Sequence, residues 1–352
     1  MGEVVLQSAW GWQIAMYLFL GGLGAGSLLV AGIVSIKTKG GMPKTVRFGA
    51  WAGVICLIVG VLLLLSEVTM PLRAVILWQS FSHFGSWMTI GAWLLVVGIA
   101  VSGVWALSLT DAVTAKVKFL RSWALPLSWA ACVMGVCIAA YTGVLLSVLD
   151  AHPLWNTPLL PVLFTVSAID TGVALVALYG SLRKEPTVAA ETETNAKKAT
   201  AAASAPASAD VPEPTGEGIP LAATGAAAVE KPASAAEVVP GAAFGLGRAL
   251  EKATLALVVV EAVVLVLLLA MVGSDGEVGA LSVGLLTMGT LAVPFWLLFV
   301  IVGLAAPATA AVMSLKAKAK PWIPLAGAVC CLVGGCALRF LILMAGLPVW
   351  AL

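Results

Sequence analysis

Eight long apolar stretches dominate this chain of 352 residues and limit what it can fold into. A helix rises about 1.5 Å per residue, so about 20 apolar residues cross a hydrocarbon core of about 30 Å. We therefore predict an all-α integral membrane protein with eight transmembrane helices. The stretches cover residues 10–36, 48–67, 85–109, 123–149, 158–182, 250–273, 280–315 and 322–345.

The composition excludes two broad classes of protein. Because 61% of the residues are hydrophobic and 10% are charged, the chain belongs in the bilayer and not among soluble proteins. Its 19 basic and 17 acidic residues nearly balance, and no basic patch is interleaved with aromatic residues as in proteins that bind single strands. The expected surroundings are therefore the lipid bilayer, with no nucleic-acid partner.

Lysine and arginine residues alternate between the loops. All of them except Arg73 and Arg339 lie in or beside the loops after the first, third, fifth and seventh stretches, whereas the opposite connections carry Asp150, Asp275 and Glu277. Basic loops stay in the cytoplasm. We therefore predict a multi-pass protein of the inner (cytoplasmic) membrane with both termini on the outer, periplasmic side. The basic residues are Lys37, Lys39, Lys44, Arg47, Lys116, Lys118, Arg121, Arg183, Lys184, Lys197, Lys198, Lys231, Arg248, Lys252, Lys316, Lys318 and Lys320.

Residues 185–244 separate a five-helix part, 1–184, from a three-helix part, 245–352. From Glu185 to Gly241 the composition shifts to Ala, Pro, Thr, Ser and Glu, with no aromatic residue. Such a segment buries too little apolar surface to offset the entropy of ordering it. We therefore predict a disordered cytoplasmic linker.

Glycine and tryptophan patterns predict packing and anchoring. Gly22 and Gly26 lie inside the first apolar stretch with no strand before them, so close helix packing is favoured over a dinucleotide-binding loop. Tryptophan near helix ends is typical of interfacial anchors. The tryptophans in such places are Trp10, Trp12, Trp78, Trp87, Trp123, Trp155, Trp322 and Trp350.

The residues that could hold a redox centre are few. His83 and His152 fall in or beside outer loops, where they cannot face each other across a haem in the membrane core. The six cysteines show no C-x-x-C and no ferredoxin spacing, and we interpret them as small packing residues. We therefore predict no haem, no iron–sulfur cluster and no metal site in this chain. The cysteines are Cys56, Cys132, Cys137, Cys330, Cys331 and Cys336.

Three ionisable residues lie well inside the apolar stretches, where a charge costs at least about 2.5 kcal/mol on insertion scales. Asp170 and Glu261 are expected near mid-membrane, and Arg339 about two turns from the outer surface. One hypothesis is that the three form a proton path across the membrane. The alternative is that Asp170 only bonds neighbouring hydroxyls such as that of Thr171, while Arg339 only neutralises a buried carboxylate.

Several polar side chains are expected to converge in the outer half of the membrane. Donors, acceptors and a carboxylate within an apolar wall suit a quinone headgroup, and a quinol loses two protons as it loses two electrons. Glu67 is the candidate catalytic residue, a general base, and Tyr141 or His83 would hydrogen-bond the opposite carbonyl. Alternatively, Glu67 and Arg73 simply pair at the interface and His83 caps a helix. The candidate quinone-binding residues are Gln13, Tyr17, Glu67, Arg73, His83, Tyr141 and Asp150.

Motifs spread over most of the chain outside the linker match one known family. They are the first-helix run 12–26, Met70-Pro71-Leu72-Arg73 before Ser86-Trp87-Met88, the segment 141–146, Pro153-x-Trp155 running into 158–161 with Ser167, and the last-helix segment 334–339. Together they resemble the NrfD/PsrC family, the integral membrane subunits of polysulfide-reductase-like complexes.

The resemblance implies two four-helix bundles with both termini outside. It implies exchangeable menaquinone or ubiquinone beside an iron–sulfur subunit of the four-cluster ferredoxin-like kind. That partner would connect to a catalytic subunit such as a molybdopterin enzyme or a multihaem cytochrome. Glu67 and Tyr141, with Gln13 and Tyr17, match the family's polar positions near the quinone, although the segment 67–73 departs from the usual second-helix ending.

We therefore predict a membrane anchor subunit of a respiratory oxidoreductase. It would exchange electrons between the quinone pool and an iron–sulfur partner, and would carry the quinone half of the reaction, with proton translocation as an open addition. Two alternatives stay open. One is a secondary transporter in which Pro294 breaks the seventh helix to form a substrate site. The other is a purely structural anchor without a quinone site.

Overall fold

The computed structural model describes residues 11–39, 43–67, 86–182, 242–316, 320 and 322–349, without the side chains of residues 43, 67 and 242–245. Within these ranges every regular element is a helix. Eight segments are long and apolar enough to span a membrane, which confirms the predicted count. The predicted linker, 185–244, lies outside the described residues up to residue 241.

Seven of the spans are single helices, and most of their bounds lie close to the predicted ones. In a continuous helix the backbone N–H and C=O groups bond one another, as a lipid environment requires. Two short helices, α5 (Asp111–Thr114) and α6 (Lys118–Ser122), connect α4 to α7. The seven are α1 (Trp12–Thr38), α2 (Pro43–Glu67), α4 (Trp87–Ser108), α7 (Ala124–Ser147), α8 (Leu159–Leu182), α10 (Ala242–Gly273) and α14 (Trp322–Ala345).

The predicted single helix over 280–315 is wrong, because this stretch is interrupted. α11 (Gly276–Thr287) ends before a turn, and the chain resumes as α12 (Ala292–Pro294), η2 (Phe295–Ala305) and α13 (Ala306–Ser314). Gly289 and Pro294 favour the break, since proline lacks the N–H that a continuing helix needs. The indole N–H of Trp296 donates to the carbonyl of Thr287, at 3.0 Å. It thus gives a partner to one of the carbonyl groups that have none within the helix at the C-terminal end of α11.

The coil of η2 is wider than an α-helix. In such a π-helix each N–H bonds the carbonyl five residues back, so one turn takes more residues. The buried positions of η2 are Phe295, Phe299, Gly303 and Leu304. At 100° per residue these four would be spread over about half of the helix circumference. This span therefore presents a different face from the one that a 3.6-residue period predicts.

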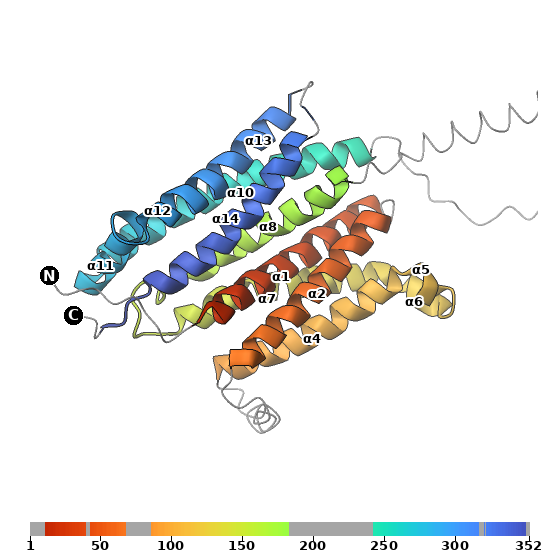
Figure 1. Ribbon diagram of the computed structural model, residues 1–352. Coiled ribbons are helices and arrows are strands. Elements are labelled where there is room, and N and C mark those ends of the chain that lie inside the picture. The colour runs from red at the N-terminus through yellow and green to blue at the C-terminus, as the bar shows by residue number, and fades with distance from the viewer. Residues whose placement is uncertain are drawn as a thin grey trace, which may run out of the picture. The chain divides into compact units, whose positions relative to one another are not determined.

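Helix α1 is central to the packing. It contacts α2, α7, α8 and α14, while α14 also contacts α8, η2 and α13. In Figure 1, α1, α2, α4 and α7 lie beside one another, and α8, α10, α12, α13 and α14 lie beside one another. α8 and α14 therefore bring the first half of the chain against the last.

Small residues let several helix backbones touch. A Cβ added to Gly26 of α1 would overlap the carbonyl of Ala168 on α8, and one added to Gly172 would overlap the backbone of Gly26. Gly303 of η2 and Gly334 of α14 meet in the same way. In lipid, where no hydrophobic force draws helices together, such close contact supplies the attraction. The predicted packing through Gly26 is confirmed.

Buried hydroxyls join α1 to its neighbours. Ser27 donates to the carbonyl of Gly49 on α2 at 2.8 Å, and Ser128 of α7 donates to Ser35 at 2.9 Å. Interhelical hydrogen bonds of this kind contribute on the order of 0.6 kcal/mol each in a bilayer. They favour one register of α1 against α2 and α7.

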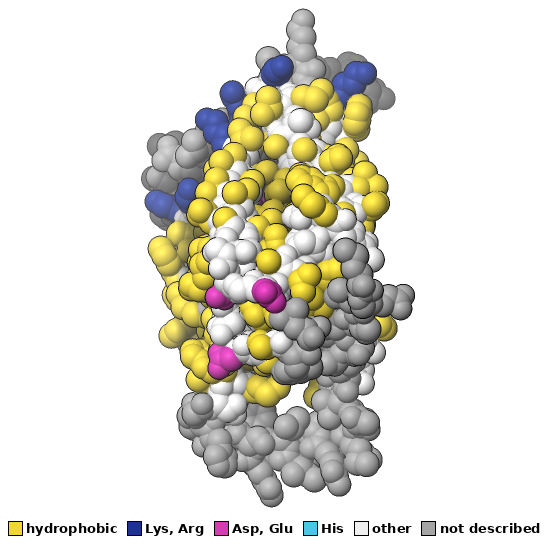
Figure 2. All heavy atoms as spheres, turned by 90° about the vertical axis from the view of Figure 1, so that its left-hand side faces the viewer, with side chains coloured by type: hydrophobic (Ala, Val, Ile, Leu, Met, Phe, Trp, Pro, Cys, Tyr) yellow, Lys and Arg dark blue, Asp and Glu magenta, His cyan; other side chains and the backbone are white. Residues whose placement is uncertain are grey.

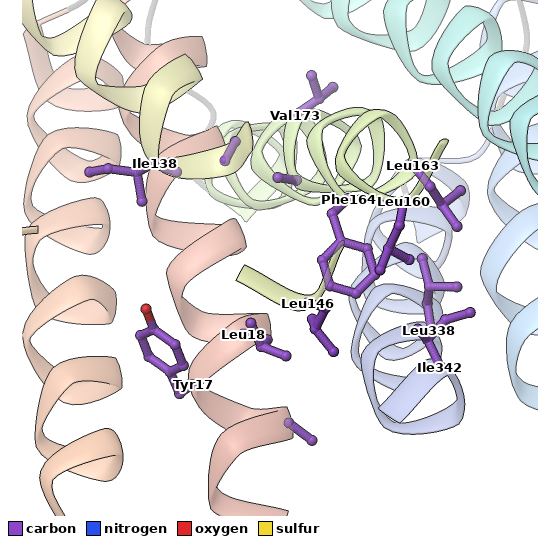
Figure 3. Packing of buried hydrophobic residues seen from close by; sticks show 14 of the residues in the cluster. Tyr17, Leu18, Ile138, Leu146, Leu160, Leu163, Phe164, Val173, Leu338 and Ile342 are labelled. Atoms are coloured by element: carbon purple, nitrogen blue, oxygen red, sulfur yellow. The ribbon is translucent and has the colours of Figure 1, made fainter. Parts of the chain in front are cut away.

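The core lies mainly around α1, α7, α8 and α14. Figure 3 shows Leu18 of α1 on the side of Leu146, Phe164 and Leu338, whereas Tyr17 points the other way. Leu18, Leu146 and Phe164 are fully buried. Large apolar side chains such as Leu62, Val266 and Trp296 are exposed instead, as expected for a surface that faces lipid.

Charged residues mark the two ends of the helices. One end, which we call the basic end, is where α1, α8 and α13 end and α2, α10 and α14 begin. On the face shown in Figure 2, lysine and arginine gather at one end and the carboxylates lie away from it. The basic end carries Lys37, Lys44, Arg47, Lys116, Lys118, Arg121, Arg248, Lys252, Lys316 and Lys320, and the opposite end carries Asp150, Asp275 and Glu277.

Candidate functional site

Two tyrosines lie together where α1, α2, α4 and α7 converge. Tyr17 of α1 and Tyr141 of α7 are both buried and lie within electrostatic range of each other. Tyr17 packs on α2, since a Cβ added to Gly60 would lie 3.5 Å from its Cδ2. The phenol of Tyr141 fills the space before Gly91 of α4, where an added Cβ would overlap it.

The pair lies toward the end of the helices opposite the basic end. Tyr17 is five residues from the start of α1 and Tyr141 is six from the end of α7, which places both within about 10 Å of that end at 1.5 Å per residue. Gly91 is four residues from the start of α4. The two tyrosines are thus held at nearly the same depth.

The structure describes only some of the other predicted quinone-site residues. Gln13 lies in the first turn of α1 and is half-buried. Glu67 is the last residue of α2, and its side chain lies outside the described part. Arg73 and His83 belong to residues 68–85, which are not described. Asp150 is exposed in the loop after α7, where it accepts a hydrogen bond from Asn156 at 2.9 Å.

The loop between α7 and α8 is tied to the end of α14. Trp155 is fully buried and donates to the carbonyl of Ile342 at 2.8 Å, so its prediction as an interfacial anchor is wrong. His152 stacks on Trp155, and its Nδ1 donates to the carbonyl of Gly346 at 3.1 Å. Burial lowers the pKa of His152 from its ordinary 6.5, partly offset by the carbonyls of Gly346 and Leu347.

A second polar group, the mid-membrane cluster, lies among α8, α10 and α14. We define it as Asp170, Glu261, Cys331 and Arg339 with Ser167, all of them buried. Asp170 accepts a hydrogen bond from the thiol of Cys331, with an Sγ–Oδ2 distance of 3.1 Å. Its other oxygen, Oδ1, has no hydrogen-bond partner among the described residues.

Arg339 is held mainly by neutral groups. Its Nη1 donates to the Ser167 hydroxyl at 2.5 Å and to the Gly335 carbonyl at 3.0 Å. Its Nη2 donates to the carbonyl of Phe164 at 3.3 Å, and its Cζ lies 5.2 Å from the centre of the Phe164 ring. Gly22 of α1 makes room, because an added Cβ would lie 3.0 Å from Nη2.

The carboxyl of Glu261 lies beside the Ser167 hydroxyl and within electrostatic range of Asp170 and Arg339. Where the structure is described, the one ion pair closer than 4 Å joins Arg47 to Asp111, at 2.8 Å. Arg339 therefore touches neither carboxylate directly, and Ser167 stands between it and Glu261. The three residues predicted to form a proton path are brought together.

One alternative for Asp170 is wrong. Thr171 donates to the carbonyls of Ser167 and Ala168 in its own helix, at 2.9 and 3.0 Å, and not to Asp170. The partner is Cys331, which the sequence indicated only as a packing residue. A spacing of eight residues puts Cys331 on nearly the same face of α14 as Arg339, and this was the available signal. In the described ranges no three or more His, Cys, Asp or Glu side chains are grouped to hold a metal.

The interruption before Pro294 bears on the transporter alternative. Met288, Gly289 and Thr290 are exposed. Transporters place their substrates at broken helices in the protein interior, whereas this break lies on the surface. The described residues at the break thus offer no enclosed substrate site.

Comparison with known proteins gives consistent matches. A family model described as "Polysulphide reductase, NrfD" matches residues 4–197. The C subunit of polysulfide reductase from Wolinella succinogenes is 36% identical over 190 residues, which are 49% of this chain and 58% of that protein. Protein NrfD of Escherichia coli K12 is 31% identical over 199 residues, 50% of this chain and 62% of that protein. The match therefore spans about three-fifths of the length of each of these relatives.

Proposed function

The chain belongs to the NrfD family, and from this premise we propose that it is the quinone-exchanging membrane subunit of a respiratory oxidoreductase. It lies in the inner (cytoplasmic) membrane with both termini on the periplasmic side, and the separation of charge between the helix ends supports this orientation. The observation that carries the proposal is the buried pair Tyr17 and Tyr141, two hydroxyls at one depth near the periplasmic end.

The residues of this region fit a quinone headgroup. A quinone is a flat apolar ring with two carbonyl acceptors, and ligand sites of this kind combine an apolar wall with a few placed donors. The phenols of Tyr17 and Tyr141 are donors, and Gln13 lies one turn from Tyr17 on the same face of α1. Either menaquinone or ubiquinone has this headgroup chemistry.

The roles of the residues follow from the chemistry of a quinol, which supplies two electrons and two protons. Tyr141 and Tyr17 orient the headgroup by hydrogen bonding to its oxygens. Glu67, at the end of α2, accepts a proton as general base. Asp150, exposed in the loop after α7, passes protons to water. Arg73 and His83, predicted to lie nearby, complete the proposed site.

The electrons pass to an iron–sulfur partner seated over the periplasmic end. This subunit therefore carries only half of an oxidoreduction, and the partner hands the electrons to a catalytic subunit such as a molybdopterin enzyme or a multihaem cytochrome.

We also propose that α1, α2, α4 and α7 form one four-helix bundle, and that α8, α10, the span 292–314 and α14 form a second. The contacts of α1 with α2 and α7, of α4 with α7, and of α14 with α8 and η2 support this division, while α8 also packs on α1 and α7.

Glu67→Gln in the purified complex separates this function from a structural anchor. We expect quinol oxidation to fall about a hundredfold, the lower range for loss of a general base, while assembly with the partner is kept. Glu277→Gln, which removes an exposed carboxylate from the same end of the helices, is the matched control. Unchanged oxidation by Glu67→Gln would favour the anchor.

Binding can be measured without turnover. The purified protein should quench the fluorescence of a quinol analogue at a saturating stoichiometry of one, and unlabelled quinone should reverse the quenching. An iron–sulfur protein should co-purify under mild detergent. If neither quenching nor such a partner is found, the proposed function is wrong.

A further inference from the structure

The connection between α4 and α7 presents basic and large apolar side chains at the basic end of the helices. It contains the short helices α5 and α6 (Figure 1), and we call residues 109–123 the surface segment. The helices on either side of it, Trp87–Ser108 and Ala124–Ser147, are membrane spans. Because the chain leaves one span and enters the next within these residues, the surface segment lies at the border between lipid and water.

Two side-chain contacts hold the surface segment against the start of α2. Nη1 of Arg47 pairs with Oδ2 of Asp111 at 2.8 Å, and the indole N–H of Trp51 donates to the hydroxyl of Thr110 at 3.1 Å. Thr110 in turn donates to the carbonyl of Ala106 on α4, at 2.9 Å. The segment is therefore attached to two helices, and its exposed side chains have a defined arrangement.

The positive charge of the surface segment exceeds its negative charge. Lys116, Lys118 and Arg121 are exposed, and none of them forms an ion pair within the described ranges. Asp111 is the only acidic residue between positions 109 and 123, and it already pairs with Arg47. Three cations therefore face the surroundings without a carboxylate of their own.

The basic residues at the start of α10 differ in this respect. Arg248 and Lys252 are also exposed, but both lie within one turn of Glu251 on the same helix. A carboxylate so close along a helix offsets part of their charge. The two basic regions thus have similar cations in different surroundings.

Large apolar side chains lie beside the three cations. Phe119 is 68% exposed, Trp123 49% and Val117 48%. The ring centres of Phe119 and Trp123 are 5.7 Å apart. At 100° per residue, Lys118 and Arg121 lie on another side of this turn than the two rings. The surface segment thus has an apolar side and a basic side next to each other.

An anionic phospholipid matches both sides with one molecule. Its phosphate can contact the cations while its acyl chains contact the rings. Interfacial segments with Lys or Arg on one face and Trp or Phe on the other bind at this boundary, and each Lys or Arg near an anionic lipid surface adds attraction. A soluble acidic protein would match the charge, but it would not explain exposed rings at the lipid border.

We propose that the surface segment is a binding site for an anionic phospholipid of the leaflet at the basic end. The headgroup phosphate accepts hydrogen bonds from Lys118 and Arg121, in the manner of other charge-assisted pairs, and Lys116 adds to the attraction. Phe119 and Trp123 contact the upper part of the acyl chains. This binding goes beyond the proposed function and does not depend on quinone exchange.

Native mass spectrometry of the purified full-length protein tests the basic side. The delipidated protein in mild detergent is titrated with dioleoylphosphatidylglycerol and, in parallel, with dioleoylphosphatidylcholine. Lys118→Gln combined with Arg121→Gln should weaken binding of the phosphatidylglycerol at least about tenfold, since each cation near an anionic surface contributes roughly fivefold. The matched control, Arg248→Gln combined with Lys252→Gln, removes one lysine and one arginine from the same end and should bind like the wild type.

Two results of this titration would overturn the proposal. One is an equal affinity of the two double variants for phosphatidylglycerol. The other is an equal affinity of the wild type for the two lipids. All four substituted positions are exposed, so the variants should fold, and size-exclusion chromatography checks that they do.

Phe119→Ala tests the apolar side. Because less apolar surface meets the acyl chains, the affinity for dioleoylphosphatidylglycerol should fall about fivefold. The control is Val133→Ala, which removes apolar surface from α7 at a position that is 59% exposed and should bind like the wild type. Wild-type affinity of Phe119→Ala would overturn the phospholipid as the occupant and would favour a soluble acidic partner.

Discussion

Arg339 of α14 donates a hydrogen bond to Ser167 of α8 with an Nη1–Oγ distance of 2.5 Å, although 172 residues separate them in the sequence. The hydroxyl stands between the guanidinium and Glu261. A full positive charge in the membrane interior is thus held by a hydroxyl, two carbonyls and a phenyl ring. The two buried carboxylates, Asp170 and Glu261, keep oxygens that the arginine does not engage.

Ser167→Ala should destabilise the protein. The change leaves Nη1 of Arg339 with the Gly335 carbonyl as its remaining partner, and an under-satisfied buried charged group costs about 1–3 kcal/mol. Thermal unfolding in detergent should show a lower midpoint. The control is Ser181→Ala, because Ser181 is exposed and donates to Ala177 of its own helix. An equal midpoint for both variants would contradict the bridging role.

Gly26→Ala should disrupt the contact between α1 and α8. The new methyl group would overlap the carbonyl of Ala168, and overpacking of this kind costs about 1–3 kcal/mol or more. We expect a lower yield of monodisperse protein in size-exclusion chromatography. Gly103→Ala is the matched control, since a Cβ there meets nothing within 4 Å, and wild-type behaviour of both variants would argue against this packing.

Tyr141→Phe should slow quinol oxidation about tenfold, which corresponds to one hydrogen bond of about 1.4 kcal/mol. The ring stays packed against Gly91, so the fold should be unaffected. The comparison is Tyr179→Phe, because Tyr179 lies at the basic end of α8 with its ring stacked on Phe48 at 4.1 Å. Both rates are measured with one quinol and one acceptor. Equal rates would remove Tyr141 from the site.

His152 should make stability depend on pH. Burial lowers its pKa from 6.5, so the unfolded protein binds this proton more readily than the folded one. The contribution to the free energy of unfolding is therefore complete above pH 6.5 and is lost as the pH falls through the lower, folded-state pKa. Unfolding of His152→Gln should vary less over this range than unfolding of the wild type. Parallel pH profiles would contradict the assignment.

The membrane spans could be predicted because hydropathy over a window of 20 or so residues is a local property. The turn at Gly289 could not, because 280–315 is apolar on both sides of it and hydropathy does not register a change of direction. Only the surplus length of that stretch and Pro294 hinted at the interruption. The bounds of the single helices depended on local composition, and most of them agree closely.

The residues of the candidate sites also divide into those that a local sequence signal predicts and those that depend on long-range contacts. Asp170, Glu261 and Arg339 stood out because charges are rare in apolar helices. Cys331 did not, and Ser167 was noted only as part of a family motif, because their contacts with Asp170 and Arg339 depend on the long-range pairing of α8 with α14.

The eleven residues of η2 affect how substitutions in this segment should be interpreted. A helical wheel drawn at 100° per residue accumulates an angular error along the wider coil, so that positions beyond Phe299 rotate out of phase with their true surroundings. A tryptophan or cysteine scan analysed on such a wheel would report a scattered pattern. Plotted with the larger number of residues per turn of a π-helix, the same scan should bring Phe295, Phe299, Gly303 and Leu304 onto one face.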